Sequence, residues 1–111
     1  MQEITTLLEK YNNFKGAQIR SVEYISLTER IVTLGDEDED GEDMYSVKLR
    51  FSDIQSSKIL EQSVLGYLDM ASGITLIKEN DLYGFSLGKG TSMLHVHSAP
   101  LYIVATNIKI D

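Results

Sequence analysis

The chain has 111 residues, no cysteine and a single proline, and its 17 acidic against 10 basic side chains give a net charge of −7. This length suits one domain that buries its own core, so we expect residues 1–111 to form a single domain. A chain without cysteine has no disulfide, thiolate metal site or cysteine nucleophile, which favours a reducing, cytoplasmic location. No apolar run approaches the roughly 20 residues of a membrane-spanning helix, so we expect no membrane partner.

The first half of the chain predicts one helix followed by strands. Apolar side chains at helical spacing predict an amphipathic helix over residues 2–12, and these are Ile4, Leu7, Leu8 and Tyr11. The β-branched and aromatic composition of residues 18–27 and 31–34 predicts a hairpin. Over residues 45–51, apolar and polar side chains alternate, as in a strand with one face in water.

The second half predicts one further short helix and several strands. Apolar spacing predicts a helix over residues 62–72, ended by Gly73. Four segments separated by turn-forming residues predict an antiparallel meander, namely residues 74–78, 82–87, 93–98 and 101–110. The last segment begins apolar on both faces, which indicates a central strand. We therefore expect an α+β fold, in which an antiparallel sheet of six or seven strands, bent or folded into a sandwich, carries an N-terminal helix and one further short helix.

One segment supplies all the excess negative charge. Its seven acids are Asp36, Glu37, Asp38, Glu39, Asp40, Glu42 and Asp43, which leaves ten acids against ten Lys and Arg elsewhere. Clustered Lys and Arg are needed to neutralise phosphates, and here they are scattered, so no nucleic-acid partner is expected. A cation or a basic protein fits this segment better.

The same segment matches the opening of a calcium loop. Asp36, Asp38, Asp40 and Gly41 follow the pattern D-x-D-x-D-G, whose alternate carboxylates converge on one ion. The match ends there, because Val47 stands where a bidentate glutamate is required and no helix is predicted on either side. Three interpretations remain open: a solvated loop between strands, an incomplete cation site, and a charged docking surface.

His95 and His97 are the only histidines and stand two residues apart. In the strand predicted there, both imidazoles would point to one face and could share a metal ion. A metal site needs a further ligand, and Asp81 and Glu79 are candidates for it. Two ordinary histidines on the sheet surface are the alternative.

The segment Gly88-Lys89-Gly90-Thr91-Ser92 has a superficial likeness to a phosphate-binding loop. The order is wrong for a P-loop, in which Lys and then Ser or Thr follow the second glycine at the start of a helix. The prediction is a hairpin turn that leads into the next strand.

The layout of the chain resembles that of small bacterial immunity proteins. The resemblance covers size, acidity and strand layout, and it includes Asn13-Phe14-Lys15-Gly16-Ala17 before the first long strand, Val47-Lys48-Leu49-Arg50-Phe51, and the closing Tyr102-Ile103-Val104. It implies a cytoplasmic protein that binds and neutralises the toxin of its own cell, with no catalytic residue or cofactor. It carries no site residue over to this chain.

We therefore expect a protein-binding module, most concretely an immunity-type inhibitor whose acidic segment docks a basic toxin domain. Two alternatives stay open. One is a metal-dependent enzyme that uses His95 and His97. The other is a calcium-responsive module that uses Asp36, Asp38 and Asp40.

Overall fold

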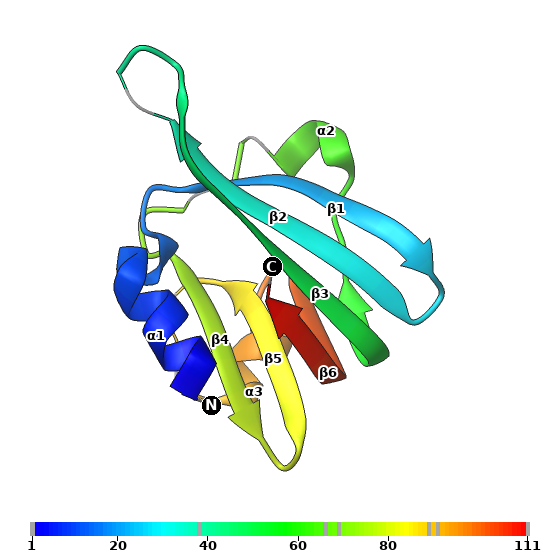
Figure 1. Cartoon of the computed structure of the whole chain (residues 1–111). Coiled ribbons are helices and arrows are strands. Elements are labelled where there is room, and N and C mark those ends of the chain that lie inside the picture. The colour runs from blue at the N-terminus through cyan, green and yellow to red at the C-terminus, as the bar shows by residue number, and fades with distance from the viewer. Residues whose placement is uncertain are drawn as a thin grey trace.

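The computed structural model describes residues 2–37, 39–65, 67–68, 70–88, 90 and 92–110. In this part of the chain six strands form one antiparallel sheet, in the order β1-β2-β3-β6-β5-β4. The strands are β1 (Gln18–Ser26), β2 (Glu29–Glu37), β3 (Asp43–Lys58), β4 (Ile74–Glu79), β5 (Leu82–Leu87) and β6 (Tyr102–Ile110). The helical elements are α1 (Gln2–Lys10), η1 (Asn12–Phe14), α2 (Gln62–Leu65) and α3 (Met93–Ser98) (Figure 1). The predicted α+β fold with a mainly antiparallel sheet is confirmed.

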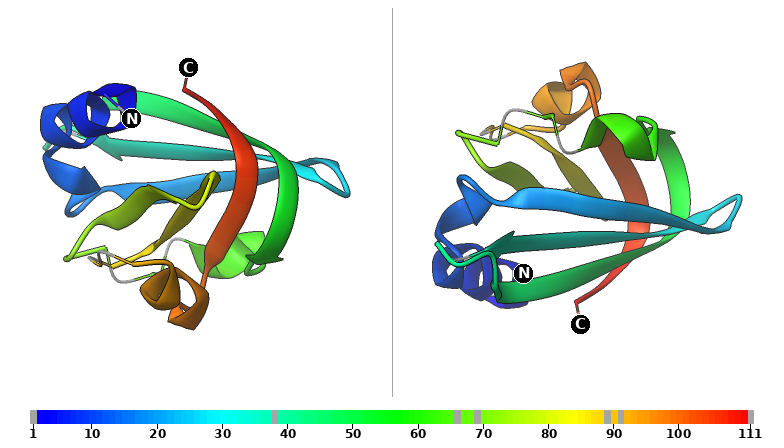
Figure 2. Two further views of the ribbon diagram at one scale, coloured as in Figure 1. Left: turned by 90° about the horizontal axis from the view of Figure 1, so that it is seen from below. Right: turned by 90° about the horizontal axis from the view of Figure 1, so that it is seen from above.

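The sheet is strongly bent, and the bend lies in the long strand β3. Asp53 has a left-handed backbone (φ 54°), and the register between β3 and β6 shifts just after it, between Ile54 and Ser56. Asn107 Nδ2 donates to Asp53 Oδ2 at 2.9 Å and Ile54 N–H donates to Thr28 O at 3.0 Å, so strand β6 and the turn between β1 and β2 support the bend. The sheet therefore curves around one interior (Figure 2).

This interior holds the hydrophobic core. Its fully buried side chains include Phe14, Leu34, Leu49, Phe51, Phe85 and Ile103. The rings of Phe51 and Phe85, from opposite halves of the sheet, lie 5.6 Å apart. Because Val47, Leu49 and Phe51 are buried while Ser46 and Lys48 are exposed, the alternation predicted for β3 is confirmed.

Helix α1 and η1 cover one side of the bent sheet. Ile4 and Leu7 are buried, as their helical spacing predicted. The ring of Tyr11 lies 5.2 Å from that of Phe14 and 4.4 Å from that of Tyr45 on β3. We call Tyr11, Phe14 and Tyr45 the aromatic cluster. It fixes the N-terminal elements to the start of β3.

The strand predicted over residues 93–98 is wrong, because this segment forms helix α3. Ser92 caps the helix by accepting from His95 N–H at 3.4 Å. Gly84 of β5 leaves room for it, since a Cβ there would lie 2.8 Å from Met93 Sδ and 3.0 Å from Val96 Cγ2. The sequence of residues 93–98 contains no information about this space, because the space is made by a glycine 12 residues before Val96. Tertiary packing therefore determines the structure of this segment, against its local pattern.

The helix predicted over residues 62–72 is too long, since α2 ends at Leu65. Beyond it, Tyr67 N–H donates to Val64 O at 3.0 Å and Leu68 N–H to Leu65 O at 3.4 Å, which are local turn bonds, and a long-range bond follows at Met70. Met70 O accepts from Gly16 N–H at 2.8 Å and from Gly73 N–H at 2.9 Å, which ties this segment to the start of β1. These bonds replace the i to i+4 bonds of a longer helix.

Strand β6 lies between β3 and β5, so the prediction of a central strand is confirmed. Ile103 and Val104, on opposite faces, are both buried. Among the described residues, no helix has the length and apolar character needed to cross a membrane.

Candidate functional site

The acidic segment forms the projecting end of the β2–β3 hairpin. Asp36 and Glu37 are the last residues of β2 and Asp43 is the first of β3. Between them we define the acidic tip as Glu39, Asp40, Gly41 and Glu42, all of which are exposed. Asp38 lies outside the described residues. Figure 1 shows the hairpin extending beyond the rest of the sheet, which presents these carboxylates at a protruding point.

Asp36 and Glu37, at the base of the tip, have partners within the protein. Glu37 N–H donates to Asp36 Oδ1 at 2.8 Å, and Arg20 Nη2 lies 3.8 Å from Glu37 Oε1. Arg20 reaches this place because it crosses Gly35, where a Cβ would lie 2.4 Å from Arg20 Nε. Asp36 and Glu37 thus lie closer to the body of the sheet than Glu39, Asp40 and Glu42.

A large apolar side chain stands beside these acids. Met44 follows Asp43 and is 64% exposed. Single exposed apolar residues are common on proteins, but this one lies next to a concentrated charge. The candidate site thus combines a cluster of negative charges with one exposed apolar side chain, that of Met44.

Below the acidic tip, burial and nearby charge both shift the pKa of the Tyr45 hydroxyl. Burial of its ring raises the pKa of the Tyr45 hydroxyl above the ordinary value of 10.0, and the nearby carboxylate of Asp36 and Tyr11 add to this rise. Arg20 acts in the opposite direction. Asp36 thus interacts electrostatically with Tyr45 on the neighbouring strand β3.

A calcium site on Asp36, Asp38 and Asp40 receives no support from the described part of the segment. Asp36 belongs to β2, where it pairs with Tyr45, and strands flank the turn on both sides. Among the residues that the structure describes, no three His, Asp or Glu side chains converge as metal ligands.

The expectation that His95 and His97 share one face is wrong, because both lie on α3, where residues two apart point about 200° apart around the axis. The half-buried His95 ring lies against Gly90. The exposed His97 contacts Tyr102 edge-on, with ring centroids 5.2 Å apart. Glu79, a suggested third ligand, instead accepts from Met93 N–H at 3.1 Å through Oε2.

The expectation of a hairpin turn at residues 88–92 is also wrong, since α3 separates β5 from β6. Lys89 and Thr91 lie outside the described residues. A short helix does follow Ser92, but its first N–H groups already have acceptors in Glu79 and Ser92. A carboxylate at this position repels a phosphate rather than recruiting one.

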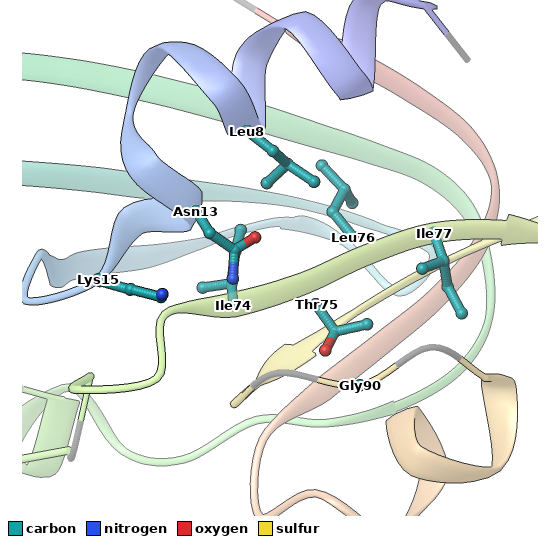
Figure 3. A pocket seen from close by; sticks show the side chains of 8 residues that line it. All are labelled: Leu8, Asn13, Lys15, Ile74, Thr75, Leu76, Ile77 and Gly90. Carbon is teal, nitrogen blue, oxygen red and sulfur yellow. The ribbon is translucent and has the colours of Figure 1, made fainter.

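A small groove, which no sequence signal indicated, runs beside β4. Its volume is about 160 Å³. The side chains that line it are Leu8, Asn13, Lys15, Ile74, Thr75, Leu76, Ile77 and Gly90 (Figure 3). The described lining is largely hydrocarbon with one ammonium group. None of these described lining residues is an acid or a histidine.

The opposite end of β2 carries an apolar surface that sequence reasoning also missed. Tyr24, Ile25 and Leu27, at the turn between β1 and β2, are exposed, Leu27 by 83%. We call these three residues the apolar tip. The β-branched and aromatic composition of residues 18–27 predicted a strand, but only the tertiary structure shows that this part of β1 extends past the core.

Comparison with known protein families, with curated proteins and with solved structures finds no match to this chain.

Proposed function

We propose that this chain is a protein-binding module, most concretely an immunity-type inhibitor that docks a basic toxin domain through the acidic tip and is not an enzyme. The observation that carries the proposal is the position of the charge. Seven acids lie within eight residues, and the outermost described ones, Glu39, Asp40 and Glu42, are exposed on a projecting hairpin.

A projecting cluster of charge suits the first stage of association. Exposed carboxylates attract a cationic surface over about one Debye length, roughly 8 Å at physiological salt. This attraction raises the association rate and disfavours acidic partners. It contributes less to the lifetime of the complex, which depends on apolar anchors removed from water.

Met44 supplies such an anchor beside the charge. A long, unbranched thioether adapts its shape to a partner surface, and methionine is enriched in interfaces. The two contributions are therefore separable by kinetics, with the acids controlling association and Met44 controlling dissociation.

The test screens the proteins encoded by the neighbouring genes for a basic binding partner and measures its association and dissociation rates at low and high salt. A variant with Glu39→Gln, Asp40→Asn and Glu42→Gln should associate about tenfold more slowly at low salt, with a smaller loss at high salt. The matched control, Glu9→Gln with Glu61→Gln and Asp81→Asn, removes the same charge from other exposed sites and should change the rate little. Met44→Ala should accelerate dissociation at every salt concentration.

An association rate that is equal in the tip variant and the control would reject docking through the acidic tip. A loss of binding independent of salt would reject electrostatic steering. Catalytic turnover by this chain of any substrate of the co-encoded protein would reject the inhibitor role itself.

A further inference from the structure

Strand β1 is an open edge of the sheet. Because it pairs only with β2, alternate backbone N–H and C=O groups face away from its partner. Helix α2 covers the beginning of this edge, where Gln62 Nε2 donates to Arg20 O at 2.7 Å. Residues 23–26 are exposed. Among the described residues, no group outside β2 bonds to the backbone of residues 21–25.

The other edge strand, β4, is protected in the usual ways. Its first half is buried beside η1, and it ends in the charged residues Lys78 and Glu79. Charged side chains and covering elements are common means of preventing edge pairing. The exposed half of β1 has neither Lys nor Pro, and Glu23 is its only charge. β1 is thus the edge that remains available.

Exposed apolar side chains gather along the same edge. Seven large apolar residues are exposed in the described part of the chain, and five of them belong to the apolar tip or to α2 and its following turn: Tyr24, Ile25, Leu27, Val64 and Tyr67. Helix α2 lies at the beginning of β1 and the apolar tip lies at its end (Figure 1). The two groups therefore flank the open backbone.

We propose that the exposed half of β1 pairs antiparallel with β1 of a second copy of this chain, about a two-fold axis near Tyr24. Antiparallel pairing reverses the second strand, so Leu27 of one copy comes level with Ser21 of the other, beside its α2. The apolar tip of each copy then covers Val64 and Tyr67 of the other. One self-complementary patch thus satisfies both the backbone and the apolar surface, as a two-fold interface requires.

The charge distribution fits this arrangement. Gln18, at the start of β1, pairs with Gly35 near the acidic tip, so antiparallel pairing places the two acidic tips at opposite outer ends of the dimer. Near the axis the charge on β1 is Glu23, which this register places opposite Ile25 of the other copy rather than opposite the other Glu23. The charges of β2 at this end have partners within each copy. Glu29 Oε2 lies 2.8 Å from Arg50 Nη2, and the Arg30 guanidinium lies 4.1 Å from the centre of the Tyr24 ring. Two chains of net charge −7 can therefore meet here without opposing their acidic segments.

Sedimentation velocity over a range of protein concentrations tests the pairing. The purified chain should form a dimer that persists at high salt, since backbone pairing and apolar burial do not depend on charge. Ile25→Lys and Leu27→Lys should each weaken the dimer by about tenfold or more, because a lysine forfeits apolar burial and brings a charge into the interface. Leu94→Lys is the matched control, since Leu94 is 78% exposed on α3, and it should leave the dimer unchanged.

Cross-linking gives the register, because the chain has no cysteine of its own. Opposed Cα atoms in an antiparallel pair lie roughly 4.5–5.5 Å apart, within disulfide range. Single cysteines introduced at positions 21 to 27 should therefore form disulfide-linked dimers most efficiently at position 24, which lies opposite itself, and Leu94→Cys should not.

A chain that sediments as a monomer at every concentration would overturn the proposal. So would a dimer that is insensitive to both lysine substitutions, or one whose cross-links form away from β1. None of these three results bears on the acidic tip, because association with the basic partner is measured separately.

Discussion

The two ends of β2 differ in the surface that they expose and in the side chains that pack beneath that surface. At its Glu37 end the acidic tip stands above the aromatic cluster, in which the Tyr11 and Tyr45 rings lie 4.4 Å apart. At its Glu29 end the apolar tip stands above a polar network, in which Glu29 accepts from Arg50 at 2.8 Å and from Ser52 at 3.3 Å. We call the aromatic cluster the aromatic base of the acidic tip. We call the network of Glu29, Arg50 and Ser52 the polar base of the apolar tip.

This difference separates what stabilises each end from what each end can bind. Nine residues of strand span about 27 Å, which is more than three Debye lengths at physiological salt. The two tips therefore act independently on any partner. Stability should depend on the two bases and recognition on the two tips, and the following predictions test this separation from the largest expected effect to the smallest.

Removing the aromatic base should cost the most stability. Tyr45→Ala deletes a half-buried ring that contacts Tyr11 and Phe14, so the free energy of unfolding should fall by about 2–4 kcal/mol. Urea denaturation followed by circular dichroism measures this loss. Met44→Ala, at the neighbouring exposed position, should change stability by less than about 0.5 kcal/mol. Equal effects of the two substitutions would show that the cluster does not support this end.

The same tyrosine should produce an alkaline dependence of stability. Its folded-state pKa is raised above 10.0, mainly by burial and also by Asp36. The neutral hydroxyl is therefore favoured in the folded state, and the stability it contributes is complete below pH 10 and is lost as the pH rises through the raised pKa. Tyr45→Phe should flatten this alkaline loss. Parallel stability profiles for the wild type and variant above pH 10 would contradict the assignment.

The polar base should give a smaller change in stability, and this change should occur at acidic rather than alkaline pH. The hydrogen bond from Arg50 lowers the pKa of the Glu29 carboxyl below 4.5, with a further contribution from Ser52, although partial burial opposes it. The stabilisation is present above that unfolded value and is lost as the pH falls through the lowered pKa. Glu29→Gln should reduce the acid-side loss. Thermal unfolding from pH 6 to pH 2 would refute this if the two proteins lost stability in parallel.

The acidic tip itself should contribute least to stability. Glu39→Gln with Asp40→Asn and Glu42→Gln removes exposed charges that repel one another, so the free energy of unfolding should stay within about 0.5 kcal/mol or rise slightly. Denaturation at low salt, where repulsion is strongest, is the sensitive measurement. A marked destabilisation would mean that the tip is part of the fold and would remove the separation between base and tip.

Local patterns predicted the elements whose residues face one environment along their whole length. The spacing of Ile4 and Leu7 predicted α1, and the alternation of Val47, Leu49 and Phe51 predicted β3, because each side chain repeats the same contact with the core. The positive φ angles of Asn80 and Asp81 confirm the turn that their residue types predicted. Of the candidate site, the acidic segment could be predicted, whereas the apolar tip, the groove beside β4 and the true placement of the histidines could not.

The sequence by itself determined the acidic segment, the α+β class and most strands, because these depend on composition and on periods of two or 3.6 residues. Only the tertiary structure decided that residues 93–98 form a helix, since the niche that receives Val96 is made by Gly84 of another strand. It also decided that β1 ends the sheet and that its apolar residues extend beyond the core, because strand order depends on contacts between residues far apart in the chain. The charge of a side chain follows from its residue type, whereas its exposure depends on which other residues pack against it in the folded chain.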